Sequence, residues 1–203
     1  SGEIRMIKYI LAALGIGIVA GYLSSNWGSV LVGNLISDYV FNGALLSLLF
    51  VMGVSFGMDK DSIAKMRQTG IRILVVPLVV AIGSILGGLI GGLILGIDLV
   101  ACMAVSAGYG WYTLAGPLIG QLFGAEWGTL GFVSNFLREL LTIVAISLLV
   151  RMDRYAPVAS GGATSMDTTL PVIVRYSGSE ALITAFSSGF ALRVAAPFSI
   201  MAI

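Results

Sequence analysis

The sequence of 203 residues predicts an all-α integral membrane protein. We expect about five transmembrane helices and two oppositely oriented re-entrant helical hairpins that meet at the bilayer midplane. Three observations predict this fold class. Hydrophobic residues make up 58% of the chain and charged residues only 10%, whereas soluble domains carry about 25% charged residues. Five apolar segments are long enough to span a bilayer, and two more are interrupted by glycine, proline and hydroxyl residues.

The five spans are expected at about 6–23, 39–58, 71–97, 127–150 and 180–203, the last with Arg193 inside it. The interrupted segments are 99–123, which contains GYGWYTLAGP (108–117), and 156–178, which contains GGATSMDTTLP (161–171). Residues 1–203 are interpreted as one polytopic membrane domain with a short cytoplasmic N-terminus at 1–5. Ser1 and Gly2, without an initiator methionine, are interpreted as a cloning remnant.

Lysine and arginine residues cluster before the first span, in the loop after the second, and directly after the span at 127–150. Positively charged loops stay in the cytoplasm, so the N-terminus is expected inside and the C-terminus outside. Segment 99–123 must then enter and leave on the outer side, and segment 156–178 on the cytoplasmic side. The alternative is one kinked full span at 99–123, which would place Arg151 and Arg154 outside.

Two opposed hairpins indicate a membrane transporter, because non-helical backbone at that depth is tolerated only where it is buried or lines a cavity. The N-termini of half-helices carry partial positive charge and favour a carboxylate. We expect Thr113 to cap the half-helix LAGPLIGQLF. Asp167 or Thr168 is expected to cap TLPVIVRY, with Pro171 in its first turn.

Three polar residues lie near the centre of the span 127–150. Asn135, Arg138 and Glu139 share one helix face because they are three or four residues apart. A charge at the bilayer centre costs roughly 2.5–3.5 kcal/mol on insertion scales. Glu139 is therefore predicted to carry protons or to face a bound cation. Arg138 either binds substrate or belongs to a structural network with Asp167 or Glu139.

Both interrupted segments carry side chains suited to binding a small charged solute. The aromatic residues of the first could face an ammonium group through cation–π contact, or form an interfacial belt. The hydroxyl and carboxylate groups of the second could coordinate a polar solute or Na⁺, or only cap a helix. The predicted substrate-binding residues are Tyr109, Trp111, Tyr112, Thr113, Asn135, Arg138, Thr164, Ser165, Asp167 and Thr168.

Several classes of function are excluded by composition. The chain has no histidine and one cysteine, Cys102, so an intrachain disulfide, a histidine metal site and a catalytic triad are excluded. GVSFG (53–57) matches the nucleophile-elbow pattern but lacks its base and its strand–turn–helix setting. An intramembrane aspartyl protease needs two embedded aspartates, and Asp167 alone qualifies. We therefore expect no enzyme activity, cofactor or bound metal, and the net charge of +1 indicates no nucleic-acid partner.

Glycines recur at helical spacing along the span 71–97. They form two interleaved small-residue ridges, which are expected to pack against a neighbouring helix or another subunit. The ridges consist of Gly83, Gly87 and Gly91, and of Gly88, Gly92 and Gly96.

The chain resembles the LysO family of prokaryotic lysine exporters from about Leu45 to its C-terminus. The resemblance is carried by LLFVMGVSFGMDKD, GYGWYTLAGPLIGQLFG, SNFLRELL, GGATSMDTTLPVIVR and the final span. It implies export of L-lysine, and of its toxic analogue thialysine, across the cytoplasmic (inner) membrane, with Glu139 at an important acidic position. Longer members carry an additional N-terminal membrane region. This chain is therefore expected to form a homodimer or to join a small companion membrane protein.

Lysine fits the predicted residues, because it carries two ammonium groups and one carboxylate at neutral pH. The hairpin N-termini and Arg138 can hold the carboxylate, and Glu139 or Asp167 can meet an ammonium group. Exchange for an incoming proton would offset the work of exporting a cation, about 2.3 kcal/mol per charge per 100 mV. The alternatives are a sodium-coupled carrier of a small organic anion and a passive channel.

Overall fold

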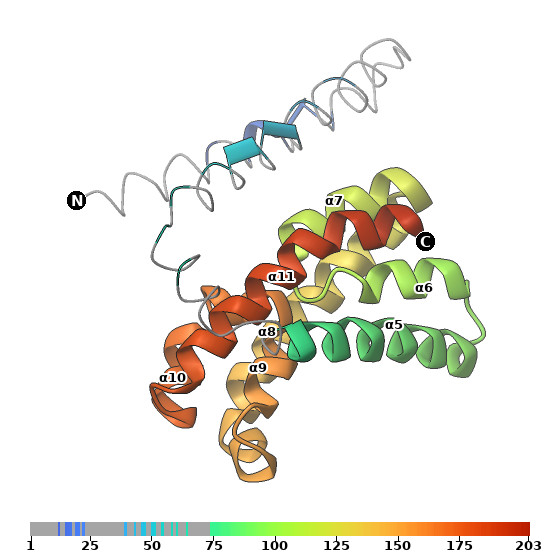
Figure 1. The fold of residues 1–203 in the computed structure, drawn as a ribbon. Helices are drawn as coiled ribbons and strands as arrows, with labels where there is room; N and C mark the ends of the chain where they lie inside the picture. Colours follow the sequence, from blue (N-terminus) through green and yellow to red (C-terminus); the bar gives the residue numbers. More distant parts are fainter. Residues whose placement is uncertain are drawn as a thin grey trace. The chain divides into compact units, whose positions relative to one another are not determined.

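The computed structural model describes residues 74–203 continuously and only isolated positions before them. The spans expected at 6–23 and 39–58, with the basic loop that follows, therefore lie largely outside the described residues. The chain divides into two units, Ser1–Met58 and Asp59–Ile203. All elements from α5 onward belong to the second unit (Figure 1).

Three long helices form the frame of this unit: α5 (Val75–Leu95), α8 (Ala125–Met152) and α11 (Ala181–Ala202). All three are long and apolar enough to cross a membrane. They begin and end within a few residues of the spans predicted at 71–97, 127–150 and 180–203. Helix α5 ends at Gly96, whose left-handed φ of 66° is the usual glycine C-cap.

The two interrupted segments form short helices joined by non-helical backbone. The first helix pair consists of α6 (Leu99–Ser106) and α7 (Tyr112–Phe123). The second helix pair consists of α9 (Ala156–Gly161), the 3₁₀ helix η3 (Gly162–Met166) and α10 (Leu170–Ser177). The described residues contain helices and no strand, which confirms the predicted all-α class.

Residues at the two ends of each helix pair lie near one another. Ile97, just before α6, and Trp127, just after α7, line the same groove. In the second helix pair, Arg154 precedes α9 and donates from Nε to the carbonyl of Ser177 at the end of α10, at 2.8 Å. Segment 99–123 is thus divided into two helices, α6 and α7, in the structure.

The helices pack closely where glycines face each other. A Cβ at Gly128 of α8 would lie 2.7 Å from the Cα of Gly120 in α7, so only hydrogen fits there. Gly88 of α5 similarly faces the backbone and side chains of α6, including Ser106. Two of the three glycines in one predicted ridge, Gly88 and Gly92, therefore pack within the chain. Within the described part of the chain, a Cβ at Gly83 would meet nothing within 4 Å.

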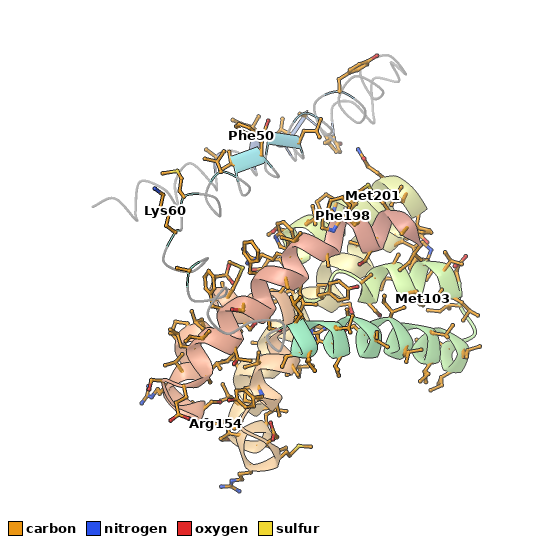
Figure 2. The ribbon with its side chains drawn as sticks, in the orientation of Figure 1. Phe50, Lys60, Met103, Arg154, Phe198 and Met201 are labelled. Carbon is orange, nitrogen blue, oxygen red and sulfur yellow. The ribbon has the colours of Figure 1, made fainter. Side chains whose placement is uncertain are left out.

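A buried apolar cluster holds the second helix pair between α8 and α11. It consists of Ile146, Val158, Ile173, Ala181 and Ala185. Figure 2 shows Arg154 at this end of the unit, whereas Phe198 and Met201 lie at the far end of α11.

The outer surface of the long helices is apolar. Side chains such as Leu78 and Ile90 of α5, and Leu141 and Val144 of α8, are more than half exposed. The most apolar window of α5 is only 11% buried, whereas that of α11 is 44% buried. Exposed apolar area of this extent indicates contact with lipid. Helix α11 is the most buried of the three long helices.

Candidate functional site

The tips of the two helix pairs meet each other through their backbones. The amide of Ala163 in η3 donates to the carbonyl of Tyr109 at 2.8 Å. Tyr109 has a positive φ of 53°, and Gly162 has a φ of 59°. A Cβ at Gly162 would overlap the Tyr109 carbonyl, so a glycine is required for this approach. The predicted meeting of the two interrupted segments is therefore seen in the structure.

Asn135 of α8 holds the first tip in place. Its Oδ1 accepts from the amide of Gly110 at 2.7 Å, and its Nδ2 donates to the carbonyls of Val105 at 2.9 Å and Gly131 at 2.8 Å. The residue is only 3% exposed. Both amide hydrogens are thus used within the protein, which favours a positioning role over direct substrate contact.

Arg138 ties the second helix pair to the long helices. Its Nε donates to the carbonyl of Ser160 at 2.8 Å, and one terminal nitrogen donates to the carbonyl of Ala159 at 3.0 Å. The other terminal nitrogen donates to the Ser84 hydroxyl of α5 at 2.8 Å. Carbonyls at a helix C-terminus lack intrahelical partners and carry partial negative charge, so a guanidinium stabilises them. The structural alternative for Arg138 fits these bonds, although its partners are carbonyls and not Asp167 or Glu139.

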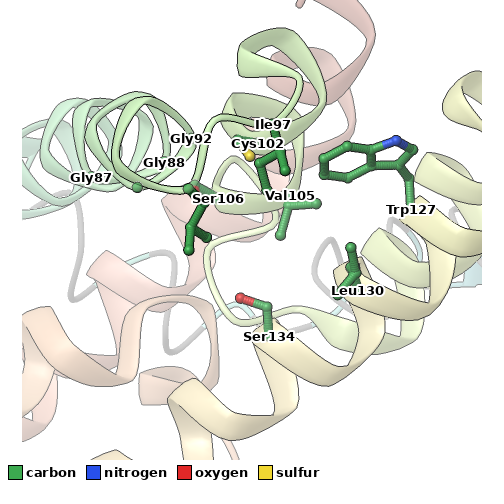
Figure 3. Close-up of a pocket in the computed structure, with 12 residues that line it drawn as sticks. Gly87, Gly88, Gly92, Ile97, Cys102, Val105, Ser106, Trp127, Leu130 and Ser134 are labelled. Atoms are coloured by element: carbon green, nitrogen blue, oxygen red, sulfur yellow. The ribbon is translucent and has the colours of Figure 1, made fainter.

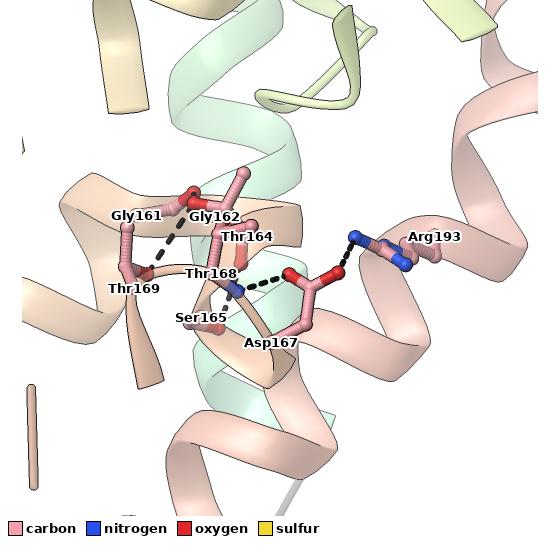
Figure 4. Close-up of polar contacts among 8 residues, drawn as sticks. All are labelled: Gly161, Gly162, Thr164, Ser165, Asp167, Thr168, Thr169 and Arg193. Atoms are coloured by element: carbon pink, nitrogen blue, oxygen red, sulfur yellow. Dashed lines mark hydrogen bonds and ion pairs between the residues drawn. The ribbon is translucent and has the colours of Figure 1, made fainter. Parts of the chain in front are cut away.

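Asp167 forms an ion pair with Arg193 of α11 (Figure 4). Its other carboxylate oxygen accepts from the amide of Thr168 at 2.7 Å. The guanidinium carbon of Arg193 lies 5.4 Å from the centre of the Trp111 ring, within the range of a cation–π contact. Arg193 therefore joins the tip of the second helix pair to the tip of the first.

Sequence reasoning noted Arg193 only as a charge within the last span and missed it as a site residue. A single arginine in an apolar span requires a partner inside the protein, and that signal was available. Its partner could not be read from the sequence, because Asp167 is 26 residues away on a non-helical segment.

Glu139 carries an unsatisfied polar atom in the site. The Tyr112 hydroxyl lies beside the Glu139 side chain. Its Oε2 is buried and has no hydrogen-bond partner among the described residues. A buried unpaired carboxylate oxygen is unfavourable, and such atoms often mark the place of an absent ligand or proton.

Tyr112 connects Glu139 to the ion pair. Asp167 and Arg193 both interact electrostatically with its hydroxyl. Its ring is fixed by edge-to-face contacts with Phe132 and Phe136, at centroid distances of 5.4 and 5.5 Å. With both carboxylates ionised, the two acids and Arg193 carry a net charge of −1, and the Arg138 guanidinium beside Gly162 adds one positive charge. We call Glu139, Asp167, Arg193, Trp111 and Tyr112 the tip cluster.

The remaining predicted residues divide into buried and exposed ones. Thr164 and Ser165 are buried and bond to backbone carbonyls of their own segment, at 2.9 and 2.7 Å. Ser165 also reaches the carbonyl of Ala185 in α11, at 2.8 Å. Tyr109 is buried with its hydroxyl donating to Ser199 at 2.9 Å. Thr113 and Thr168 are exposed.

The predicted helix caps are wrong. Helix α7 begins at Tyr112 with Trp111 as its N-cap, so Thr113 lies inside the helix. Helix α10 has Thr169 as its N-cap, not Asp167 or Thr168, and neither helix has a side-chain cap. The proline predicted in the first turn of α10 is present there. Side chains of other helices, such as Asn135, bind the backbone at the first tip instead.

A groove of about 250 Å³ lies apart from the tip cluster, between α5, α6 and α8 (Figure 3). Its walls are largely apolar and include Gly87, Gly91, Cys102 and Trp127. The predicted site residues do not line it. This groove is therefore not the site at which the sequence predicts binding.

Broken helices whose tips meet beside charged side chains, within apolar spans, are an arrangement typical of multi-pass membrane transporters. Comparison with known proteins identifies the family. The family model described as "Lysine exporter LysO" matches residues 11–203, so the chain belongs to this family.

Two curated relatives show how the match is distributed. The Escherichia coli K12 protein named "Lysine exporter LysO" is 36% identical over 159 residues, which cover 77% of this chain and 52% of that protein. The chain therefore spans about half the length of that relative. A Haemophilus influenzae protein named "Putative lysine exporter" is 28% identical over 193 residues, covering 94% of each chain. No solved structure gives a significant match.

Proposed function

We propose that this chain exports L-lysine, and analogues such as thialysine, by exchange for protons at the tip cluster. The observation that carries the proposal is the buried Oε2 of Glu139, which has no hydrogen-bond partner among the described residues. The family and the names of both relatives support lysine as the substrate.

The charge of the tip cluster suits an exchange mechanism. The negative charge of Glu139 can be neutralised by one proton or by one substrate ammonium group. The faces of Trp111 and Tyr112 suit an ammonium group as well. Because proton and substrate would neutralise the same negative charge, occupancy by one disfavours occupancy by the other. Each exchange would also offset the work of moving a cation outward, about 2.3 kcal/mol per charge per 100 mV.

The membrane topology belongs to the same proposal. We propose an inner-membrane protein in which the first helix pair re-enters from outside and the second from the cytoplasm. The N-terminus is then inside and the C-terminus outside. Single cysteines at Gly124 and Gly178, in a background lacking Cys102, should react with impermeant reagents from outside and inside respectively. Labelling of both from one side would overturn the topology.

We also propose assembly as a homodimer or with a small companion membrane protein. The exposed glycines of α5 support it, because Gly83, Gly87 and Gly91 leave room for close approach of another helix within the described part of the chain. Native mass spectrometry of purified chain should then report more than one copy or an additional subunit. A monomer that transports in liposomes would refute this.

The proposed exchange is tested by lysine counterflow in proteoliposomes. Labelled lysine should accumulate against unlabelled lysine, and an imposed pH gradient should drive net flux. Glu139→Gln keeps the shape of the side chain but cannot titrate, so pH-driven flux should disappear. Glu126→Gln is the matched control, because Glu126 lies exposed in the first turn of the same helix.

The outcome separates the alternatives. Glu139→Gln that unfolds at the wild-type temperature and still couples lysine flux to protons would remove Glu139 from the mechanism. Flux that requires Na⁺ and ignores pH would favour a sodium-coupled carrier. Lysine flux with no coupling in the unaltered protein would favour a channel.

A further inference from the structure

Arg193 occupies the two groups that a bound ammonium would require. Its guanidinium pairs with the Asp167 carboxylate at the second tip and lies over the Trp111 ring at the first. A carboxylate and an aromatic face together form a cation site. In the structure, the cation in this site belongs to the protein itself.

The contacts of Arg193 are incomplete, which suits a cation that can be displaced. The side chain is only 12% exposed, yet its Nε is buried without a hydrogen-bond partner in the described part of the chain. Arg138 shows the contrast, because each of its three guanidinium nitrogens has a partner. A guanidinium held by one carboxylate oxygen and one ring can leave more readily than one held by three acceptors.

Asp167 is arranged to remain in place when the guanidinium leaves. Its Oδ1 accepts from the amide of Thr168, and its side chain is 40% exposed, so the carboxylate is reachable from outside the protein core. An arriving ammonium group could therefore take over Oδ2 without loss of the backbone contact that orients the carboxylate.

We propose that Arg193 is a tethered cation that competes with the substrate ammonium group for Asp167 and the face of Trp111. This deepens the proposed function, on which it rests for the cationic nature of the substrate. When substrate enters, the guanidinium withdraws along α11, and when substrate leaves, it returns. Asp167 thus has one cation beside it in both the substrate-bound and the substrate-free state. In the substrate-free state, Arg193 keeps other cations out of the site.

The test uses binding of a simple cation by the purified full chain in lipid nanodiscs. The chain has three tryptophans, so Trp27→Phe and Trp127→Phe leave Trp111 as the single fluorescent reporter. n-Butylammonium and L-lysine are titrated separately, because the first has no carboxylate. Arg193→Gln should bind n-butylammonium about tenfold more tightly, which corresponds to about 1.4 kcal/mol. Arg193→Lys keeps a cation on the tether and should give a smaller gain.

Arg154→Gln is the matched control, since it removes an arginine–carboxylate pair with Glu180 at the end of the unit. Arg154→Gln should leave the affinities for n-butylammonium and for L-lysine unchanged. Unchanged or weaker n-butylammonium binding in both Arg193 variants would overturn the competition. So would weaker lysine binding with unchanged n-butylammonium binding, because Arg193 would then hold the substrate carboxylate.

The inference and the proposed function can fail separately. Tighter n-butylammonium binding in Arg193→Gln, with no lysine binding or transport by the unaltered chain, would keep the tethered cation and reject lysine as the substrate. Lysine–proton exchange with no gain in either Arg193 variant would keep the proposed function and reject the tethered cation.

Discussion

Replacement of Asn135 by alanine should detach the first tip from α8. The change removes three hydrogen bonds in a site that is only 3% exposed. A hydrogen bond contributes about 0.5–1.5 kcal/mol net, and a buried group left unpaired costs about 1–3 kcal/mol. The amide of Gly110 and the carbonyl of Val105 would both lose this partner. We therefore expect a loss of about 3–5 kcal/mol in the free energy of unfolding.

Cys102 makes this loss measurable, because it is the single cysteine of the chain and lies half-buried against Gly92 of α5. A thiol-reactive dye in a thermal ramp then reports the separation of α6 from α5. At about 2–4 °C per kcal/mol, Asn135→Ala should unfold at least about 6 °C below the unaltered protein. Ser134→Ala is the control on the neighbouring exposed position. Equal unfolding temperatures for Asn135→Ala and the control would show that Asn135 does not anchor the tip.

Three further predictions concern packing. Gly128→Ala should lower the free energy of unfolding by about 1–3 kcal/mol, because its Cβ would press on the α7 backbone. Gly162→Ala should lower the free energy of unfolding by more than about 2 kcal/mol, because alanine is strained at a positive φ and its Cβ would overlap the Tyr109 carbonyl. Trypsin should then cut the second helix pair faster. Arg138→Lys should lower the unfolding temperature although charge is kept, because an ammonium cannot reach all three acceptors; an unaltered temperature would contradict the structural role.

The sequence predicted the elements better than their contacts. Glycine, proline and hydroxyl density located both breaks, because these residues destabilise a helix wherever they occur. The shared face of Asn135, Arg138 and Glu139 also followed from helical spacing. The bonds along that face did not, since Asn135 and Arg138 bind carbonyls and an amide that only the tertiary fold brings near.

The ion pair of Asp167 with Arg193 illustrates the same limit. Sequence reasoning assigned Asp167 to a helix cap or to a substrate, because both are local interpretations of a hydroxyl-rich segment. The approach of α11 determines the actual partner, and it depends on Gly189, where a Cβ would lie 2.6 Å from the amide of Met166. The sequence shows the glycine, but it does not show which segment packs against it.

The bond between the two tips has a consequence for how this family can diversify. It joins one main-chain amide to one main-chain carbonyl, so exchanging the side chains around it leaves both bonding atoms in place. Substitution of the surrounding side chains can therefore change the chemistry of the site without removing the bond between the tips. Two positions are constrained by this bond. Proline at Ala163 would remove the donor amide, and any side chain at Gly162 would clash with the Tyr109 carbonyl that accepts the bond. A saturation scan should find Gly162 intolerant of substitution and Ala163 intolerant of proline, whichever solute is tested. Tolerance at the polar neighbours should instead depend on the solute.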